Sequence, residues 1–191
     1  MERLRQIREN LEKWHPIPDA DWLFFAQKLV EVRLAKKALL LECGQVEGYL
    51  SFVESGLVRL VIPDQGAGQT FGFVTEGEFL CAYDSFVWQS PSDYQVETLT
   101  EVVLWRLNFA DLQQIYRETT VGNTLGRRIA EGLFLNKSKR ERSLLVDTAA
   151  QRYERLFVEK PQWIQRIPLK YLASYIGISP QALSRIRRRI S

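Results

Sequence analysis

Hydrophobic and polar residues alternate over short segments between residues 30 and 108, and glycine or proline separates many of these segments. The segment LVRLVI, residues 57–62, places successive side chains on opposite faces of an extended chain. A period of two residues is typical of β-strands with one buried face. About eight such segments fit the span and no helix interrupts them, so we predict antiparallel strands that close into a jelly-roll β-barrel. The predicted strands cover residues 30–34, 38–42, 49–55, 57–62, 69–74, 77–79, 94–100 and 102–108.

Apolar residues at spacings of three and four predict helices on both sides of the strands. We expect an amphipathic helix over 1–14, a short helix from Asp19, and a helix over 108–116 capped by Asn108. A long helix over 119–145 and a further helix over 148–159, which Lys160-Pro161 ends, complete the prediction. The chain thus divides into an N-terminal sensor domain (1–118), a long helix (119–146) and a small helical domain (147–191), which makes an α+β fold.

The long predicted helix carries an apolar stripe that requires a partner surface. Gly122, Gly126 and Gly132 would allow a second backbone to approach closely. A twofold homodimer in which this helix packs against its copy explains both features. Packing of the stripe on the chain's own barrel is the alternative. The candidate dimer interface consists of Val121, Leu125, Ile129, Leu133 and Asn136.

The C-terminal segment 166–191 has the pattern of two helices joined by a tight turn. Gly177 stands where the turn requires a residue that tolerates a positive φ, and Ala173 where the two helices approach closely. Ser179 and Pro180 suit the N-cap and the first position of the second helix. The positions that such a helix-turn-helix buries are apolar, namely Leu172, Ile176, Ile178, Leu183 and Ile186.

The second helix of this unit would present hydrogen-bond donors along one edge. Arg185 is the leading candidate to read a base, because an arginine can contact guanine O6 and N7 together in the major groove. Neighbouring residues would contact other bases or phosphates. The candidate DNA-binding residues are Lys170, Ser179, Gln181, Ser184, Arg185, Arg187, Arg188 and Arg189.

Charge is divided unevenly along the chain. From Lys160 onward there are seven Lys or Arg residues and no Asp or Glu, so this end carries +7. With an overall formal net charge of +3, the rest of the chain carries 3 − 7 = −4. A basic end on an acidic body is expected of a nucleic-acid-binding protein. The alternative is a helical hairpin whose arginines are merely solvated.

Composition argues against several classes of protein. The 191 residues, 46% of them hydrophobic, suffice for a packed core. The apolar runs are too short to span a membrane and the charged N-terminus is unlike a signal sequence, so we expect a cytoplasmic protein without a membrane partner. Cys43, Cys81 and the single histidine, His15, form no ligand set, and we expect no metal or cofactor. No catalytic triad or phosphate loop is evident, so an enzyme is the weakest hypothesis.

A strand-rich roll, a long helix and a terminal helix-turn-helix, in this order, resemble the family of the cyclic-AMP receptor protein and the fumarate-nitrate reductase regulator (Crp/Fnr) over nearly the whole chain. The most telling pieces are ESGLVRL (54–60), GEF (77–79) and LASYIGISPQALSRIRRR (172–189). The resemblance implies a dimeric transcription regulator that binds double-stranded DNA, with Arg185 at the position that reads guanine. It also implies a small-molecule effector and RNA polymerase as further candidate partners. The chain stops after the second helix, without the β-hairpin wing of many family members.

The segment that binds the cyclic phosphate in this family is altered here. Where the family's cyclic-nucleotide binders have Gly-Glu for the ribose and Arg-Ser or Arg-Thr for the phosphate, this chain has Cys81-Ala82 and Ser92-Asp93. A phosphate taken from water into a pocket needs charge-assisted donors. We therefore predict that cyclic AMP does not bind in the family's usual way.

Aromatic residues would build the wall of the corresponding pocket. They suit an apolar or aromatic effector, or they simply fill the core and leave no ligand site. The candidate effector pocket consists of Phe71, Phe73, Gly77, Glu78, Phe79, Tyr83, Phe86, Trp88, Ser92, Asp93 and Tyr94.

The leading hypothesis is a DNA-binding regulator whose sensor domain biases the orientation of two reading helices. The alternative is a ligand-binding or protein-interaction module that keeps the helix-turn-helix only as structure. The first predicts a twofold-symmetric DNA motif at physiological salt. The second predicts weak, sequence-blind DNA binding that disappears at moderate salt.

Overall fold

Eight antiparallel strands form two four-stranded sheets in the computed structural model, which describes residues 4–190. One sheet has the strand order β1-β8-β3-β6 and the other β2-β7-β4-β5. The strands are β1 (Val30–Leu34), β2 (Leu39–Leu41), β3 (Tyr49–Ser55), β4 (Leu57–Ile62), β5 (Gln69–Thr75), β6 (Phe79–Leu80), β7 (Gln95–Thr98) and β8 (Val102–Asn108). The predicted number of strands is confirmed, and β1, β3, β4 and β8 have the predicted bounds.

The two sheets pack as a sandwich, which corrects the expected barrel. Within residues 4–190 no strand ladder joins one sheet to the other, so the barrel is not closed. A short helix, α3 (Tyr83–Trp88), also interrupts the strands between β6 and β7, where we expected none. The core between the sheets contains Val53, Val58 and Leu104, all fully buried.

The turn between β3 and β4 depends on glycine. Gly56 has a φ of +106°, and a Cβ at this position would lie 2.4 Å from the carbonyl oxygen of Glu101. A residue with a side chain therefore meets both backbone strain and a collision. The break between the predicted strands 49–55 and 57–62 is therefore confirmed at Gly56.

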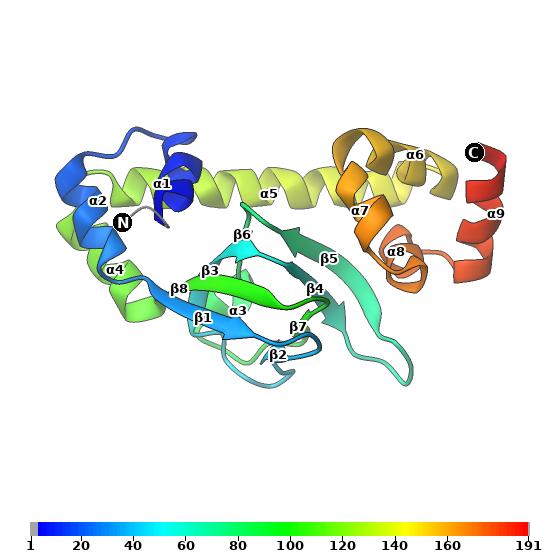
Figure 1. The fold of residues 1–191 in the computed structure, drawn as a ribbon, viewed down its shortest axis with the longest axis horizontal. Helices are drawn as coiled ribbons and strands as arrows, with labels where there is room; N and C mark the ends of the chain where they lie inside the picture. The colour runs from blue at the N-terminus through cyan, green and yellow to red at the C-terminus, as the bar shows by residue number, and fades with distance from the viewer. Residues whose placement is uncertain (1–3, 191) are drawn as a thin grey trace.

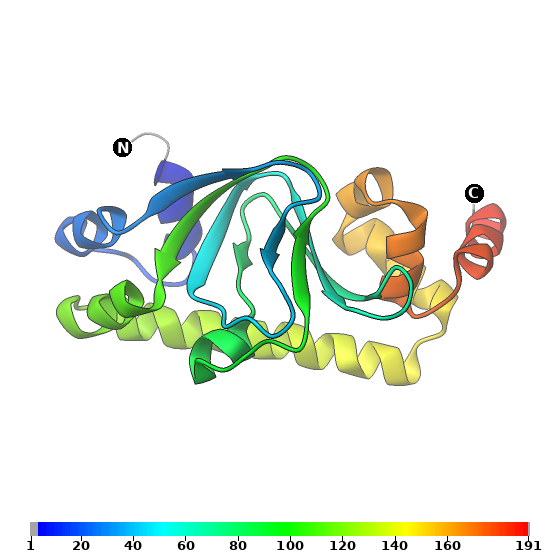
Figure 2. The same ribbon diagram turned by 90° about the horizontal axis from the view of Figure 1, so that it is seen from below.

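Helices occupy both ends of the sandwich, and one long helix runs along it (Figures 1 and 2). The long helix α5 spans 25 residues and connects a cluster of N-terminal helices and α4 at one end to four helices at the other. The helices are α1 (Arg5–Glu12), α2 (Asp19–Ala26), α4 (Phe109–Glu118), α5 (Gly122–Val146), α6 (Ala149–Glu159), α7 (Pro161–Arg166), α8 (Leu169–Ile176) and α9 (Pro180–Ile190). Among the described residues, no helix combines the length and apolarity that crossing a membrane requires.

The start of α5 is tied to the N-terminal helices. The Asp21 carboxylate accepts hydrogen bonds from the backbone N–H and hydroxyl of Thr120 and from the backbone N–H of Val121, at 2.7 to 3.1 Å. A carboxylate at a helix N-terminus satisfies donors that have no partner within the helix and complements the helix dipole. This contact fixes where α5 begins relative to the sandwich.

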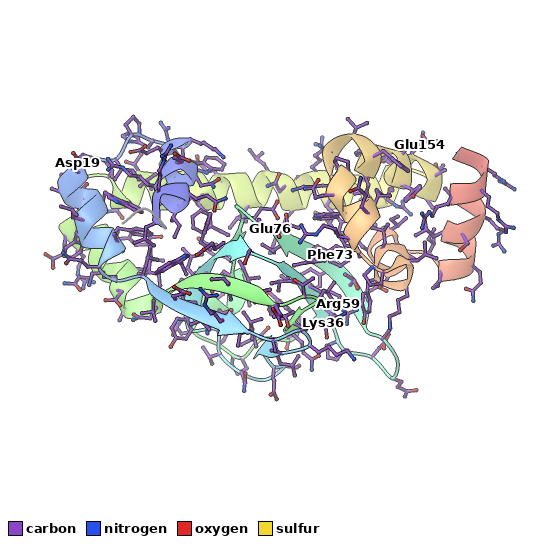
Figure 3. All side chains as sticks on the ribbon, viewed as in Figure 1. Asp19, Lys36, Arg59, Phe73, Glu76 and Glu154 are labelled. Carbon is purple, nitrogen blue, oxygen red and sulfur yellow. The ribbon has the colours of Figure 1, made fainter. Side chains whose placement is uncertain are left out.

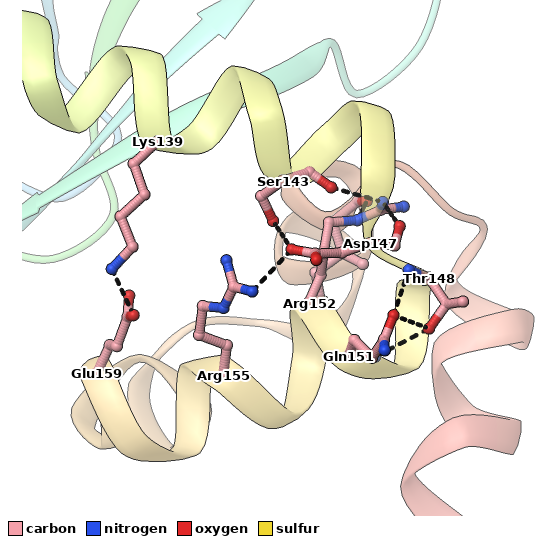
Figure 4. Close-up of polar contacts among 9 residues, drawn as sticks. Lys139, Ser143, Asp147, Thr148, Gln151, Arg152, Arg155 and Glu159 are labelled. Carbon is pink, nitrogen blue, oxygen red and sulfur yellow. Dashed lines mark hydrogen bonds and ion pairs between the residues drawn. The ribbon is translucent and has the colours of Figure 1, made fainter.

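The other end of α5 is joined to α6 by a polar cluster (Figure 4). Asp147 accepts a hydrogen bond from Ser143 and pairs with Arg155 at 2.9 Å. Arg152 donates to the carbonyls of Asp147 and Ile176, and so links this corner to α8. Thr148 and Gln151 form a capping box that starts α6. The corner between α5 and α6 is therefore held by one ion pair between side chains and by several hydrogen bonds.

Candidate nucleic-acid interface and sensor cavity

The turn between α8 and α9 has the predicted geometry. Gly177 has a φ of +86°, and its N–H and that of Ile178 return to the carbonyl of Ala173 at 3.0 Å, which closes the C-terminus of α8. Ser179 then accepts a hydrogen bond from the backbone N–H of Ala182, and α9 begins at Pro180. Hydrogen bonds within residues 173–182 therefore set the direction in which α9 leaves α8.

A buried core holds α9 on α8. Ala173 and Leu183 are fully buried, which agrees with the expectation that a small residue is required at the crossing. Leu172 and Ile176 are also buried, and Ile178 and Ile186 are partly buried against the same cluster. All five predicted apolar positions therefore serve the core of this domain.

The opposite edge of α9 faces solvent. Gln181 and Arg185 are exposed, as are the three arginines of the last turn, Arg187, Arg188 and Arg189, and Ser184 is half-buried. Within residues 4–190, these arginines make no hydrogen bond or ion pair with the chain. The predicted residues Lys170 and Ser179 are exposed as well, at the starts of α8 and α9. Gln181, Ser184, Arg185 and Arg188 recur at spacings of three and four along α9, so these four candidate residues share one face of the helix.

Two ion pairs attach this helical domain to the turn between β5 and β6. The Arg166 guanidinium donates to both carboxylate oxygens of Glu76 at 2.7 Å, and this contact holds the pKa of Glu76 at about 2, well below its usual value. Lys160 pairs with Glu78 at 2.5 Å. Glu78, which we expected in the effector pocket, therefore belongs to the domain interface. Gly77 does not line the cavity either, and its N–H donates to the Val53 carbonyl.

Phe73 contributes the apolar part of the same interface. It packs edge-on against Trp163 and is tilted against Tyr175, and Figure 3 places Phe73 and Glu76 on the side of the sandwich that faces the C-terminal helices. Phe71, two residues earlier, instead packs against Tyr94 inside the sandwich. Phe71 is the extra residue of a β-bulge, because Leu60 pairs with Gly72 while Val61 pairs with Thr70. Because of the bulge, Phe71 and Phe73 point to opposite faces of the sheet. The expectation that Phe73 lines the pocket is therefore wrong.

Polar contacts between β5 and α8 complete the interface. Thr70 N–H donates to the Ser174 hydroxyl at 2.8 Å, and the Gln69 side chain donates to the Ser174 carbonyl at 2.6 Å. The buried Arg59, labelled in Figure 3, pairs with Glu97 at 2.8 Å and lies 3.9 Å from the ring centre of Tyr171. The sequence pattern gave no sign of these contacts, since Arg59 occupies an ordinary alternating strand position.

A cavity of about 390 Å³ lies between the sandwich and α5. Five of the predicted pocket residues line it: Phe71, Phe79, Tyr83, Phe86 and Tyr94. The remaining wall comes from further strand residues and from α1, α2, α4 and α5, four helices that the prediction did not include. Burial raises the pKa of Tyr116 on this wall to about 12 and raises that of Tyr83 as well. The lining is thus mainly apolar, with neutral polar groups.

Three predicted pocket residues lie elsewhere. Ser92 is buried but donates its hydroxyl hydrogen to the Tyr94 carbonyl, and Asp93 points to the exposed surface. Trp88 is 80% exposed at the end of α3. The positions at which the related sequences bind a cyclic phosphate are therefore not part of the cavity lining in this chain.

The predicted stripe of α5 packs on its own sensor domain. Val121, Leu125 and Ile129 belong to the cluster around Trp22, and Leu133 lines the cavity, whereas Asn136 is exposed. A Cβ at Gly126 would meet the Tyr116 ring at 2.6 Å, and one at Gly132 would meet Trp14 at 2.5 Å. These contacts correct the expectation that stripe and glycines pack against a second copy. Another face of α5 carries exposed apolar residues, including Phe134 and Leu145.

The described residues contain no cluster of three or more His, Cys, Asp or Glu side chains that could hold a metal ion. Burial and the nearby Glu47 carboxylate raise the pKa of the Cys81 thiol, so this cysteine is not an activated nucleophile.

Comparison with known proteins found a family match for the part of the chain that forms the sandwich. Residues 31–119 match the family model of the cyclic nucleotide-binding domain, which is less than half of the chain. The matched residues extend from β1 to just beyond the end of α4, and so contain the two-sheet sandwich. A search of curated proteins found no match.

Solved structures share the fold of most of the chain. FixK2 from Bradyrhizobium japonicum has a TM-score of 0.69 at 15% identity, covering 85% of this chain and 84% of its own. The c-di-GMP responsive global regulator CLP of Xanthomonas campestris has a TM-score of 0.67 at 17% identity, with 91% of both chains covered. The Thermus thermophilus Catabolite Activator Protein has a TM-score of 0.58 at 17% identity, covering 95% of this chain and 86% of its own. At these identities the likeness establishes the fold, which agrees with the resemblance to Crp/Fnr regulators.

Proposed function

We propose that this protein is a homodimeric, sequence-specific transcription regulator of the Crp/Fnr type. The observation that carries the proposal is the exposed edge of α9, where polar and cationic side chains stand on a fully buried two-helix core. Arginines that served only the protein's own structure would pair with its carboxylates, as Arg166 does with Glu76. The fold likeness to two proteins whose names describe a regulator and an activator supports the same conclusion.

In this proposal α9 enters the major groove of double-stranded DNA. Arg185 and Gln181 read base edges, because their donors lie exposed on the first two turns of the helix. Lys170, Arg188 and Arg189 contact phosphates and hold the protein on the duplex without reading sequence. The positive charge of the C-terminal end also favours binding to the negatively charged DNA backbone.

The second copy would pack on the outward face of α5. Phe134 and Leu145 are 71% and 79% exposed, and they lie eleven residues apart, which is about three helical turns and hence one face. Exposed apolar residues of this size on one helix face favour burial against a partner. Two copies joined in this way would present two copies of α9 to two half-sites about one turn of DNA apart.

The sensor domain would bias the orientation of the reading helices without cyclic AMP bound in the family's usual way. Ser92 stands where the family has the arginine for the cyclic phosphate, and the next residue, Asp93, is exposed and of the wrong charge. A regulator of this type works beside the chromosome, so we place it in the cytoplasm. RNA polymerase would be a further partner if it activates transcription.

The proposal is tested by binding measurements on DNA with two matched arginine variants. Arg185→Ala should weaken binding to the preferred DNA by about 1–3 kcal/mol and relax the preference at one base pair of each half-site. Arg117→Ala removes the same charge from an exposed position on α4 and should change neither property. Fluorescence anisotropy on DNA with each base pair varied in turn gives both quantities. Equal losses on every DNA sequence would make Arg185 a phosphate contact instead.

A further inference from the structure

We propose that the cavity between the sandwich and α5 binds an uncharged, largely apolar small molecule. This inference deepens the proposed function, because it names the class of effector that the sensor would take, and its meaning as regulation rests on that function. Binding itself can be measured without DNA. The argument comes from the size of the cavity, the charges on its wall and the position of α5.

The size and shape of the cavity fit a small organic molecule. Its volume of about 390 Å³ lies at the lower end of the range of small-molecule sites. Aromatic rings from several separate parts of the fold line it, including Trp22 on α2, Phe71 on β5 and Phe86 on α3. An empty apolar cavity leaves the surrounding atoms without contacts on one side, and an apolar guest restores these contacts.

Charged side chains contribute little to the wall. Among the described residues that line the cavity, only Asp21 and Lys137 carry a charge. The Oδ2 atom of Asp21 already accepts three hydrogen bonds from Thr120 and Val121. Lys137 is exposed on α5, where water solvates its ammonium group. A phosphate or carboxylate in the interior would therefore lose its hydration without gaining charge-assisted donors.

The polar groups that remain on the wall are neutral. Tyr83 and Tyr116 both line the cavity, and neither hydroxyl makes a hydrogen bond to another described residue. Burial raises the pKa of both, so both stay protonated at neutral pH and can each donate one hydrogen bond. Such groups satisfy an occasional oxygen of an uncharged molecule but do not neutralise an anion.

The position of the cavity connects an occupant to α5. Ile129, Ala130 and Leu133 on this helix form part of the wall, so a bound molecule contacts the helix that leads to the C-terminal domain. Val74 and Phe79 line it from the strands on either side of the Glu76 to Glu78 turn, which is ion-paired to Arg166 and Lys160. An occupant therefore contacts both connections between the sensor and the reading helices.

The experiment uses two fluorescent probes with the same aromatic frame. N-phenyl-1-naphthylamine is uncharged, and 8-anilinonaphthalene-1-sulfonate adds one sulfonate group. We expect the full-length protein to bind the uncharged probe in fluorescence titrations at least about tenfold more tightly than the anionic one. Cyclic AMP should not displace the uncharged probe. Equal binding of the two probes, no binding of the uncharged probe, or displacement by cyclic AMP would each overturn the proposal.

Two tryptophan variants locate the binding site. Ala130→Trp places a large side chain in the cavity and should weaken binding of the uncharged probe by about tenfold or more. Arg142→Trp makes the same addition at an exposed position of α5 outside the lining and should leave binding unchanged. Circular dichroism melting identifies a loss caused by unfolding, and in that case Leu133→Trp replaces the first variant. Equal affinity of a folded cavity variant and the wild type would place the probe elsewhere and overturn the proposal.

This test is separate from the test of the proposed function. If the uncharged probe does not bind but the wild-type protein still selects a DNA motif, only the ligand class is wrong. If the probe binds in the cavity and no DNA motif is found, the site stands and the regulator proposal fails.

Discussion

Breaking the ion pair between Glu76 and Arg166 should weaken the docking of the C-terminal helices on the β-sandwich in a pH-dependent manner. The pKa of Glu76 falls from 4.5 to about 2 because of Arg166, a shift of about 2.5 units. At about 1.36 kcal/mol per unit this sets an upper limit of about 3.4 kcal/mol. Both side chains are about one third exposed, at 35% and 37%, so solvent screening reduces the expected coupling to about 1 kcal/mol.

The sign of the pH dependence follows from the lowered pKa. A carboxylate whose folded-state pKa is depressed contributes its stability above its unfolded pKa, near 4.5, and loses it as the pH falls toward the folded value of about 2. The contribution is therefore complete at pH 7, and more than half of it should be lost at about pH 3. Raising the salt concentration should also weaken it, because both groups are partly exposed.

A double-mutant cycle with Glu76→Gln, Arg166→Gln and both together measures this coupling by urea denaturation. Glutamine keeps the size and some hydrogen bonding but removes the charges, so the cycle isolates the pairwise interaction. We expect about 1 kcal/mol at pH 7 in low salt and less than half of that at pH 3. A coupling energy near zero at pH 7, or one that does not change between the two pH values, would refute the assignment.

Three further predictions concern the turn, the interface and the dimer. Gly177→Ala should cost about 1 kcal/mol in urea denaturation because of its φ of +86°, whereas Gly48→Ala, in open space at an ordinary φ, should cost much less; equal effects would contradict the strained turn. Phe73→Ala should cost about 3 kcal/mol, since this buried ring fills the space between Trp163 and Tyr175, and a loss below about 1 kcal/mol would mean that the interface is loosely packed. Leu145→Glu should shift sedimentation toward the monomer, while Val158→Glu, an equally exposed change on α6, should not; a dimer unaffected by Leu145→Glu would place the interface elsewhere.

Local sequence signals predicted the parts of the fold that depend on local physics. The start of α9 was predicted at Pro180 because Gly177, Ser179 and Pro180 each satisfy a need of the neighbouring backbone. Strand β4 was predicted at residues 57–62 because its alternation reflects one buried face. Such features require no knowledge of distant residues.

Features that depend on distant contacts were missed. The bulge at Phe71 sends two aromatic residues of one strand to opposite sides, and a period of two cannot show where the period breaks. The apolar stripe of α5 was visible in the sequence, but a stripe does not show which surface covers it. In the structure Tyr116 and Trp14 of the same chain lie against the glycines of α5. Pro161 ends one helix and begins another, α7, because proline is equally acceptable at the first helical position.

The candidate site was predicted in part for the same reason. The exposure of Gln181, Arg185 and Arg188 on α9 follows from one helix and its turn, whereas their role in DNA binding stays a prediction. The pocket needs six or more segments of the chain, and only its strand and α3 residues could be proposed from the pattern. The sequence offered one signal for the domain interface, namely the acidic residues Glu76 and Glu78 in a chain whose C-terminal end is basic. Opposite charges attract, and in the structure these two residues pair with Lys160 and Arg166.

The most direct test of the central claim is selection of bound sites from random double-stranded DNA by the full-length protein at physiological salt. We expect enrichment of a twofold-symmetric motif whose half-sites are centred about one helical turn apart, each containing a guanine whose loss weakens binding of the wild type but not of Arg185→Ala. Enrichment of no motif, with binding that disappears as salt is raised, would contradict the claim that α9 reads DNA sequence.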